Sequence, residues 1–327
     1  MDCALVFGQV SGGDAGNEGL VCGPLRSTAA LEPPLNVPSP PAAPARLADL
    51  LPGVIAATMF ATSNVLSKIV LTSGADVLTL SLFRGLVGVV LLAAWLKIGT
   101  PPVPPTPRAR WISLGLGVIF AGVVFGLFAA IARVSVPIAI LSYFVYPLIT
   151  GLLGVLFGIE RISWRGALAA FAAFCGLALM IRANPQDIAL AGVAFAFGSA
   201  ICRTAILLIT RATLQDADPQ VTTWYTIVGS TALFGLVALA TWNWQGPHTT
   251  GGWAALFGVG VGTTISILAL FISIKRIGPF RTALIMFLEP LLSTIFSAPV
   301  LGEVITPIQA LGGAVMLAAL VSFQLRR

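Results

Sequence analysis

One pattern of proline and glutamate occurs twice in the chain, 143 positions apart, and it constrains the fold more than any other feature. The first copy runs from Pro147 to Glu160, and the second runs from Pro290 to Glu303. In both copies a proline interrupts a long apolar segment, and a glutamate follows 13 positions later. A repeat of this length predicts that the chain consists of two structurally similar halves.

The composition places most of the chain in lipid. Hydrophobic residues make up 57% of the sequence and charged residues only 9%, whereas soluble domains carry about 25% charged residues. A helix needs about 20 residues to cross ~30 Å of hydrocarbon, and the backbone must satisfy its own hydrogen bonds there. We therefore expect ten membrane-spanning helices, at residues 50–72, 77–97, 110–131, 137–157, 164–182, 189–210, 220–241, 252–274, 279–301 and 305–325.

The N-terminal residues 1–47 differ from the rest of the chain. They are rich in glycine, proline, serine and alanine and have no apolar period, so we expect a disordered tail. Their early apolar run is too short for the core of a secretory signal. An alternative, a start codon assigned too far upstream, stays open. The remainder divides into two five-helix repeats, 50–182 and 189–325.

The positions of lysine and arginine predict the orientation of the helices. With the N-terminus in the cytoplasm, thirteen of the 18 basic residues fall on the cytoplasmic side and two on the outer side. We therefore expect both termini on the cytoplasmic face of the cell (inner) membrane. Five is an odd number, so the second half must enter the membrane from the opposite side. The predicted fold is an all-α membrane protein of two inverted repeats, which is typical of secondary transporters working by alternating access.

Ionisable side chains within the spans are the first candidate functional residues, because each costs about 2.5–3.5 kcal/mol at a helix centre. Glu289 lies near the midplane directly before Pro290, which kinks the helix and frees a carbonyl group. It is either a protonatable coupling group or anchor for a cation, or a structural carboxylate neutralised by a buried base. Arg203 lies at the position equivalent to Asn64 of the first half. It either meets an anionic group of a substrate or pairs with Glu289.

Three further side chains lie within the spans. Arg84 is deeper than an interfacial anchor requires, so it either faces a pore or pairs with Asp76 or Glu303. Lys68 is about one turn from the outer end of its helix, where its stem can reach the interface. Tyr146 is near the midplane, and we expect its hydroxyl group to line a cavity.

Glu160 and Glu303 end the equivalent helices on opposite membrane faces. We expect them at the headgroup level, with gating as the alternative. The only histidine is His248, and the four cysteines show no C-x-x-C pair, so the sequence predicts no catalytic site, metal site or cofactor. The basic residues lie mainly between apolar segments, and they therefore require no nucleic-acid partner.

These residues resemble those of the drug/metabolite transporter superfamily, in particular its EamA-like members, over residues 50–325. The resemblance rests on the runs Tyr143–Pro147 and Phe287–Pro290, each followed by glycine and glutamate, and on Ala61–Asn64 followed by Lys68. Many members have a Trp-Gly pair where this chain has Ala61-Thr62. The resemblance implies a carrier of metabolites or drugs, often an exporter, driven by an ion gradient, for example of protons, or by a substrate gradient.

The combined hypothesis is a secondary carrier whose central cavity is lined by Asn64, Arg84, Tyr146, Arg203 and Glu289. Basic groups outnumber acidic ones within the spans, which favours a substrate with an anionic group, such as an amino acid or a nucleotide. A membrane channel or a non-transporting receptor is the alternative, followed by a membrane-embedded enzyme. The substrate, the direction of transport, the coupling ion and the oligomeric state stay open at this point.

Overall fold

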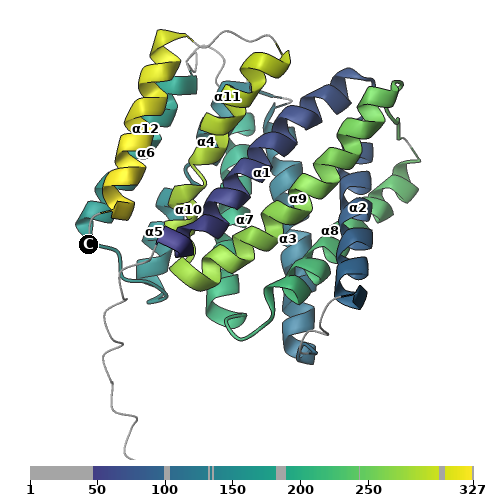
Figure 1. Ribbon diagram of the computed structural model, residues 1–327, viewed down its shortest axis with the longest axis horizontal. Helices are drawn as coiled ribbons and strands as arrows, with labels where there is room; N and C mark the ends of the chain where they lie inside the picture. The colour runs from purple at the N-terminus through teal and green to yellow at the C-terminus, as the bar shows by residue number, and fades with distance from the viewer. Residues whose placement is uncertain are drawn as a thin grey trace, which may run out of the picture. The chain divides into compact units, whose positions relative to one another are not determined.

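The computed structural model describes residues 47–98, 104–131, 133–134, 136–181, 189–242, 244–301 and 306–325, and this part of the chain is helical throughout, joined by turns and short loops (Figure 1). Its helices are α1 (Leu47–Thr72), α2 (Val77–Ile98), α3 (Pro107–Ile131), α4 (Val136–Tyr143), α5 (Tyr146–Leu156), α6 (Trp164–Ile181), α7 (Leu190–Thr213), α8 (Pro219–Thr241), α9 (Thr250–Ile277), α10 (Pro279–Ile285), α11 (Leu288–Leu301) and α12 (Pro307–Leu325).

These helices form the ten predicted spans. The fourth span consists of α4 and α5, the ninth consists of α10 and α11, and each of the others is one helix. Within the described residues, nine segments are long and apolar enough to cross a membrane, and the tenth, Pro307–Phe323, is a shorter apolar helix. The all-helical membrane fold expected from the composition is therefore confirmed, and the chain is a multi-pass integral membrane protein.

The helices of the two halves pack against each other in matching pairs. In the first half α1 contacts α9 and α11, and in the second half its equivalent, α7, contacts α3 together with α4 and α5. The contact of α2 with α9 is matched in the same way by that of α8 with α3. Equivalent helices also contact each other directly: α2 contacts α8, and α6 contacts α12 (Figure 1). This pattern is what a pseudo-two-fold relation between two five-helix units produces.

Glycines allow the closest of these approaches. A Cβ atom added to Gly176 of α6 would lie 2.8 Å from the carbonyl oxygen of Gly312 on α12, and one added to Gly312 would lie 2.6 Å from that of Gly176. Gly117 of α3 faces the backbone of α8, and Gly260, 143 positions later, faces Val87 of α2. Small residues of this kind let membrane helices pack backbone to backbone.

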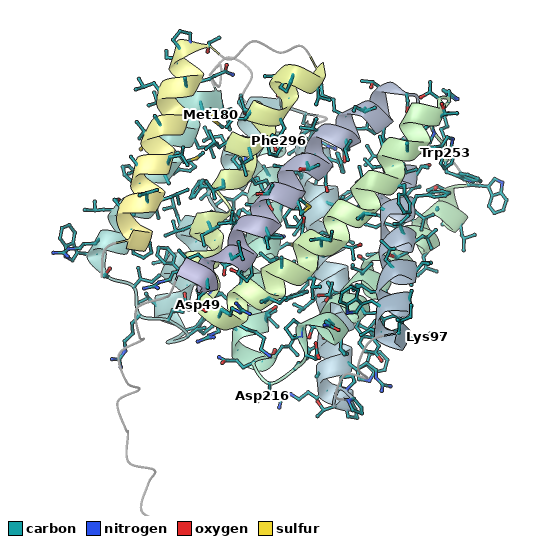
Figure 2. All side chains as sticks on the ribbon, in the orientation of Figure 1. Asp49, Lys97, Met180, Asp216, Trp253 and Phe296 are labelled. Atoms are coloured by element: carbon teal, nitrogen blue, oxygen red, sulfur yellow. The ribbon has the colours of Figure 1, made fainter. Side chains whose placement is uncertain are left out.

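The two ends of the bundle differ in charge. Asp49, Lys97 and Asp216 lie toward one end, while Met180 and Trp253 lie toward the other (Figure 2). We call the first the basic end, because the helix termini and loops there carry most of the described lysines and arginines. Those residues are Lys97, Arg108, Arg110, Arg161, Arg165, Arg211, Lys275, Arg276 and Arg281.

Candidate functional site

The fourth and ninth spans are both broken in the middle, at equivalent positions. The first break separates Tyr143 from Tyr146, and the second separates Ile285 from Leu288. Pro147 follows the first break directly, and since it has no N–H, it cannot donate to the carbonyl group of Tyr143 one turn earlier. The sequence predicted kinks at these prolines, and the structure instead has two short helices in each span. Broken spans of this type leave backbone polar groups available at membrane depth.

The two breaks meet across the pseudo-symmetry axis. The rings of Phe144 and Phe287, which are equivalent residues, lie 5.8 Å apart between their centroids. Tyr143 and Tyr146 contact Phe144 at centroid distances of 5.3 Å and 5.7 Å. A contact between equivalent residues lies on the axis that relates the halves, so the breaks form the centre of the molecule.

Two polar contacts flank this centre, and they are equivalent to each other. On one side the amide nitrogen of Asn64 donates a hydrogen bond of 3.0 Å to a carboxylate oxygen of Glu289. On the other side the guanidinium group of Arg203 lies 5.9 Å from the ring centroid of Tyr146. Asn64 and Arg203 were aligned from sequence, and Tyr146 and Glu289 are 143 positions apart. The packing of the helices therefore agrees with that alignment.

Arg203 lies in an unusual environment for a charged group. Its side chain is 3% exposed, its guanidinium stacks 5.2 Å from the centroid of Phe60, and one terminal nitrogen donates to the sulfur of Met286 at 3.9 Å. Its Nε–H has no hydrogen-bond partner. Arg203 and Glu289 interact electrostatically, but among the described residues no direct ion pair joins them. Burial of a charge without full pairing is costly, so this arrangement needs a compensating group.

Hydroxyl groups from two helices hold the start of α5. The carbonyl oxygen of Tyr146 accepts hydrogen bonds from Thr150, at 2.8 Å, and from Thr204 of α7, at 3.2 Å. Thr204 is adjacent to Arg203 in sequence, so the same segment of α7 both fixes the break and supplies the buried cation. These hydrogen bonds and the proline in the first turn, where no N–H is needed, together explain why α5 starts at a defined position.

Two of the predicted site residues lie outside this cluster. The guanidinium of Arg84 stacks over the ring of Phe120 on α3, at 5.6 Å from its centroid. Lys68 is exposed and lies one turn before the end of α1. Arg84 has no described contact with Glu289 or Tyr146.

Asp76, a suggested partner of Arg84, instead caps the start of α2. Its carboxylate accepts hydrogen bonds from the backbone of Leu78 and Thr79, from the hydroxyl of Thr79, and from the Gln245 N–H of the α8–α9 loop at 2.8 Å. Burial alone would raise the pKa of this carboxyl group. The hydrogen bonds from Thr79, Gln245 and Leu78 outweigh burial, and the pKa lies below its ordinary value.

Glu160 lies at the basic end, after α5, and its carboxylate accepts a hydrogen bond of 2.9 Å from the Phe280 N–H at the start of α10. Burial raises its pKa to about 7, against the opposing effects of that hydrogen bond and of Arg211 and Arg281. Its predicted equivalent, Glu303, lies outside the described residues. Among the described residues, no group of three or more His, Cys, Asp or Glu side chains could hold a metal ion.

Sequence reasoning missed two members of the cluster, Phe60 and Met286. Both were detectable from spacing: Phe60 lies four residues before Asn64 and so shares its helix face, and Met286 lies 143 positions after Tyr143. Their apolar character alone predicts packing and gives no sign of a site.

Taken together, paired five-helix units, centrally broken spans and buried polar groups at the breaks define the class of membrane transport proteins with inverted repeats. The model of the EamA-like transporter family matches residues 48–182 and again residues 190–323, and the chain belongs to this family. It is therefore a transporter of the drug/metabolite class, which lies in lipid and binds small-molecule substrates.

Two further comparisons agree with this assignment. An uncharacterized transporter of Archaeoglobus fulgidus is 28% identical over 207 residues, which cover 63% of this chain and 73% of that protein. A solved structure, titled only as a crystal structure of a protein, superposes with a TM-score of 0.72 at 18% identity and covers 85% of this chain and 99% of its own. At that identity the second match supports the fold alone.

Proposed function

We propose that the protein is a secondary active carrier that moves a small metabolite or drug across the cell membrane by alternating access. In this proposal Asn64, Tyr146, Arg203 and Glu289 form the substrate and coupling site between the two halves. Arg84 contributes a second cation from α2, Pro147 and Pro290 maintain the helix breaks, and Lys68 lies at the interface. The observation that carries the proposal is the buried guanidinium of Arg203, whose Nε–H has no partner.

The proposed substrate carries an anionic group and is amino-acid-like. A carboxylate beside Arg203 would complete the hydrogen bonds of the guanidinium and neutralise its charge, and the planar fork of arginine suits this geometry. Glu289 on the opposite side suits an ammonium group of the same molecule. The rings of Phe60, Tyr143 and Phe144 offer an apolar surface for the remainder.

We further propose that the basic end faces the cytoplasm and that transport is efflux coupled to protons at Glu289. The orientation follows from the excess of basic residues at that end, and efflux follows from the resemblance to exporters of the family. Cysteines placed at exposed Asp216 and Trp244 test the orientation. An impermeant thiol reagent added to intact cells should label the Trp244→Cys variant only, and the reverse result would invert the topology.

Flux in proteoliposomes tests the transport mechanism. A carrier saturates and shows counter-exchange, whereas a channel does neither. Arg203→Gln should weaken binding of an anionic substrate about 10- to 100-fold, the value of one charge-assisted hydrogen-bonded pair, and Glu289→Gln should abolish or uncouple flux. Asp216→Asn is the control, because this carboxylate is exposed on a loop. Normal coupled flux in both cluster variants would refute the proposed site.

The substrate can be found by a thermal-shift screen of metabolites against the purified protein. A ligand that binds only the folded form raises stability by RT ln(1 + [L]/Kd), or about 2.7 kcal/mol at 100 times Kd. Metabolites with a carboxylate should dominate the hits in the native protein and lose their effect in Arg203→Gln. If only uncharged compounds stabilised the protein, the assignment of Arg203 to an anionic group would be wrong.

A further inference from the structure

A second half-buried carboxylate lies outside the central cluster, where the two halves meet at the basic end. The Phe280 N–H of α10 donates to one carboxylate oxygen of Glu160, at 2.9 Å. The other oxygen faces Gly278, where an added Cβ atom would overlap it. Gly278 has φ +84°, a conformation that favours glycine. The turn before α10 is therefore shaped to accept a carboxylate from the first half.

The side chain of Phe280 adds an apolar closure to this contact. The ring is 4% exposed and packs edge-on against Phe323 of α12, with centroids 6.0 Å apart. Cβ atoms added to Gly151 of α5 or Gly166 of α6 would lie 2.8 Å and 3.2 Å from the ring of Phe280. Phe280 of the second half therefore packs between α5 and α6 of the first half and α12 of its own half.

The charged groups that act on Glu160 come from α7 and α10. They are Arg211 on α7 and Arg281 on α10, and neither forms a described ion pair with the carboxylate. The guanidinium of Arg211 donates instead to the carbonyl of Lys275, and the ammonium group of Lys275 donates to the carbonyl of Ala217. Arg211 of α7 therefore binds the last turn of α9, Lys275 of α9 binds the loop after α7, and Glu160 is left to the Phe280 N–H.

We propose that Glu160 and the turn Gly278–Phe280 form a proton-binding latch that closes the cytoplasmic end of the carrier. The inference rests on the proposed alternating-access function, since a latch has a role only if this end opens. In the closed state a protonated carboxyl group still offers its carbonyl oxygen to the Phe280 N–H. In the open state the carboxylate lies in water among the loops.

Linkage gives the direction of the pH response. Burial raises the pKa of Glu160 to about 7 in the closed state, whereas the ordinary value is 4.5. The closed state therefore binds the proton more tightly, and acidification favours closure. For a single group with these two values, the ratio of closed to open molecules should rise about tenfold between pH 8 and pH 6. Opening releases the proton to the cytoplasmic side.

The experiment measures the opening of this end directly. Spin labels are placed at Arg165→Cys and Arg276→Cys, two exposed positions in different halves, in a variant without native cysteines. Distance distributions are recorded in lipid nanodiscs at pH 6 and pH 8, without substrate. The short-distance population should rise about tenfold relative to the long one between pH 8 and pH 6, and the rise should begin as the pH falls through the pKa of about 7.

Two variants separate the latch from other titrating groups. Glu160→Gln keeps the hydrogen-bond acceptor without the charge, so it should stay closed at both pH values. His248→Gln should respond like the native chain, because this histidine, the only one in the sequence, lies in the α8–α9 loop at the other end. If Glu160→Gln does not fold, the pH at which the native response begins still tests the proposal.

A pH response that persists in Glu160→Gln, or no response in the native chain, would overturn the latch. A different outcome would refute the proposed alternating access. In that case the labels would report one distance at every pH and with every substrate found in the thermal-shift screen. Opening driven by substrate but not by pH would leave the carrier intact and refute only the role of Glu160.

Discussion

Replacement of Gly117 by alanine tests the packing that joins the halves through α3 and α8. The added Cβ atom would lie 2.7 Å from the Ser230 nitrogen and 2.9 Å from the Gly229 Cα atom, and it would overlap the carbonyl oxygen of Thr226. All three atoms belong to the backbone of α8 and cannot rotate away. The two helices must therefore separate.

The expected cost follows from three contributions. Overpacking of a tight contact costs about 1–3 kcal/mol. Separation of the helices also weakens the hydrogen bond from the Thr226 hydroxyl to the Ser113 carbonyl, now 3.2 Å long, and such interhelical bonds are worth about 0.6 kcal/mol in membranes. Alanine stabilises the helix by about 1 kcal/mol relative to glycine, because its helix propensity is higher. The net destabilisation of Gly117→Ala should be about 0.6–2.6 kcal/mol.

Gly115 provides a matched control on the same helix. A Cβ atom at Gly115 meets no atom within 4 Å, so Gly115→Ala should show only the gain of up to about 1 kcal/mol. The two variants should therefore differ by about 1.6–3.6 kcal/mol in free energy of unfolding, measured by titration with SDS in mixed micelles. Equal stabilities would show that α3 and α8 do not approach as closely as described.

Two other predictions concern the polar contacts. Thr204→Val removes one donor to the Tyr146 carbonyl and should lower the free energy of unfolding by about 0.6–1.7 kcal/mol in the same titration, whereas Thr213→Val, at an exposed position on α7, should change it little. The pKa of Asp76 lies below its ordinary value of 3.8, so its stabilising effect is present above that pH and disappears as the pH falls below it. Asp76→Asn should therefore lose stability at neutral pH and flatten the acid limb of the thermal stability profile.

The architecture could be predicted because it depends on length, polarity and symmetry. Ten apolar segments and a repeat of 143 positions leave few alternatives for a chain that must satisfy its backbone hydrogen bonds in lipid. The prolines also located the breaks in the fourth and ninth spans. The sequence did not show that each span becomes two helices, because that outcome depends on donors from another helix, such as Thr204.

The central cluster was predicted only in part, for a related reason. Asn64, Tyr146, Arg203 and Glu289 were selected as polar groups in lipid, and the structure brings them to two equivalent contacts. Arg84 was selected by the same criterion but stacks on Phe120 instead. Depth in the membrane can be read from sequence, whereas the direction of a long flexible side chain is fixed by neighbours that come from other helices.

The pair Phe144–Phe287 leads to a last prediction, about motion. If the halves exchange conformations during transport, a contact between two residues that are not equivalent is replaced by the contact between their equivalents, and it breaks. A contact between two equivalent residues maps onto itself and survives. The rings of Phe144 and Phe287 are such a contact, 5.8 Å apart, and Glu160 with Phe280 is not.

A short bifunctional thiol reagent that bridges Phe144→Cys and Phe287→Cys should therefore leave flux close to that of the unbridged double variant. The same reagent across Glu160→Cys and Phe280→Cys should stop flux, because this end could no longer open. The single-cysteine variants control for the loss of each ring and for modification of one thiol. Flux that stopped equally in both bridged variants would mean that the centre itself separates, and the halves would then not move by symmetric exchange about the Phe144–Phe287 axis.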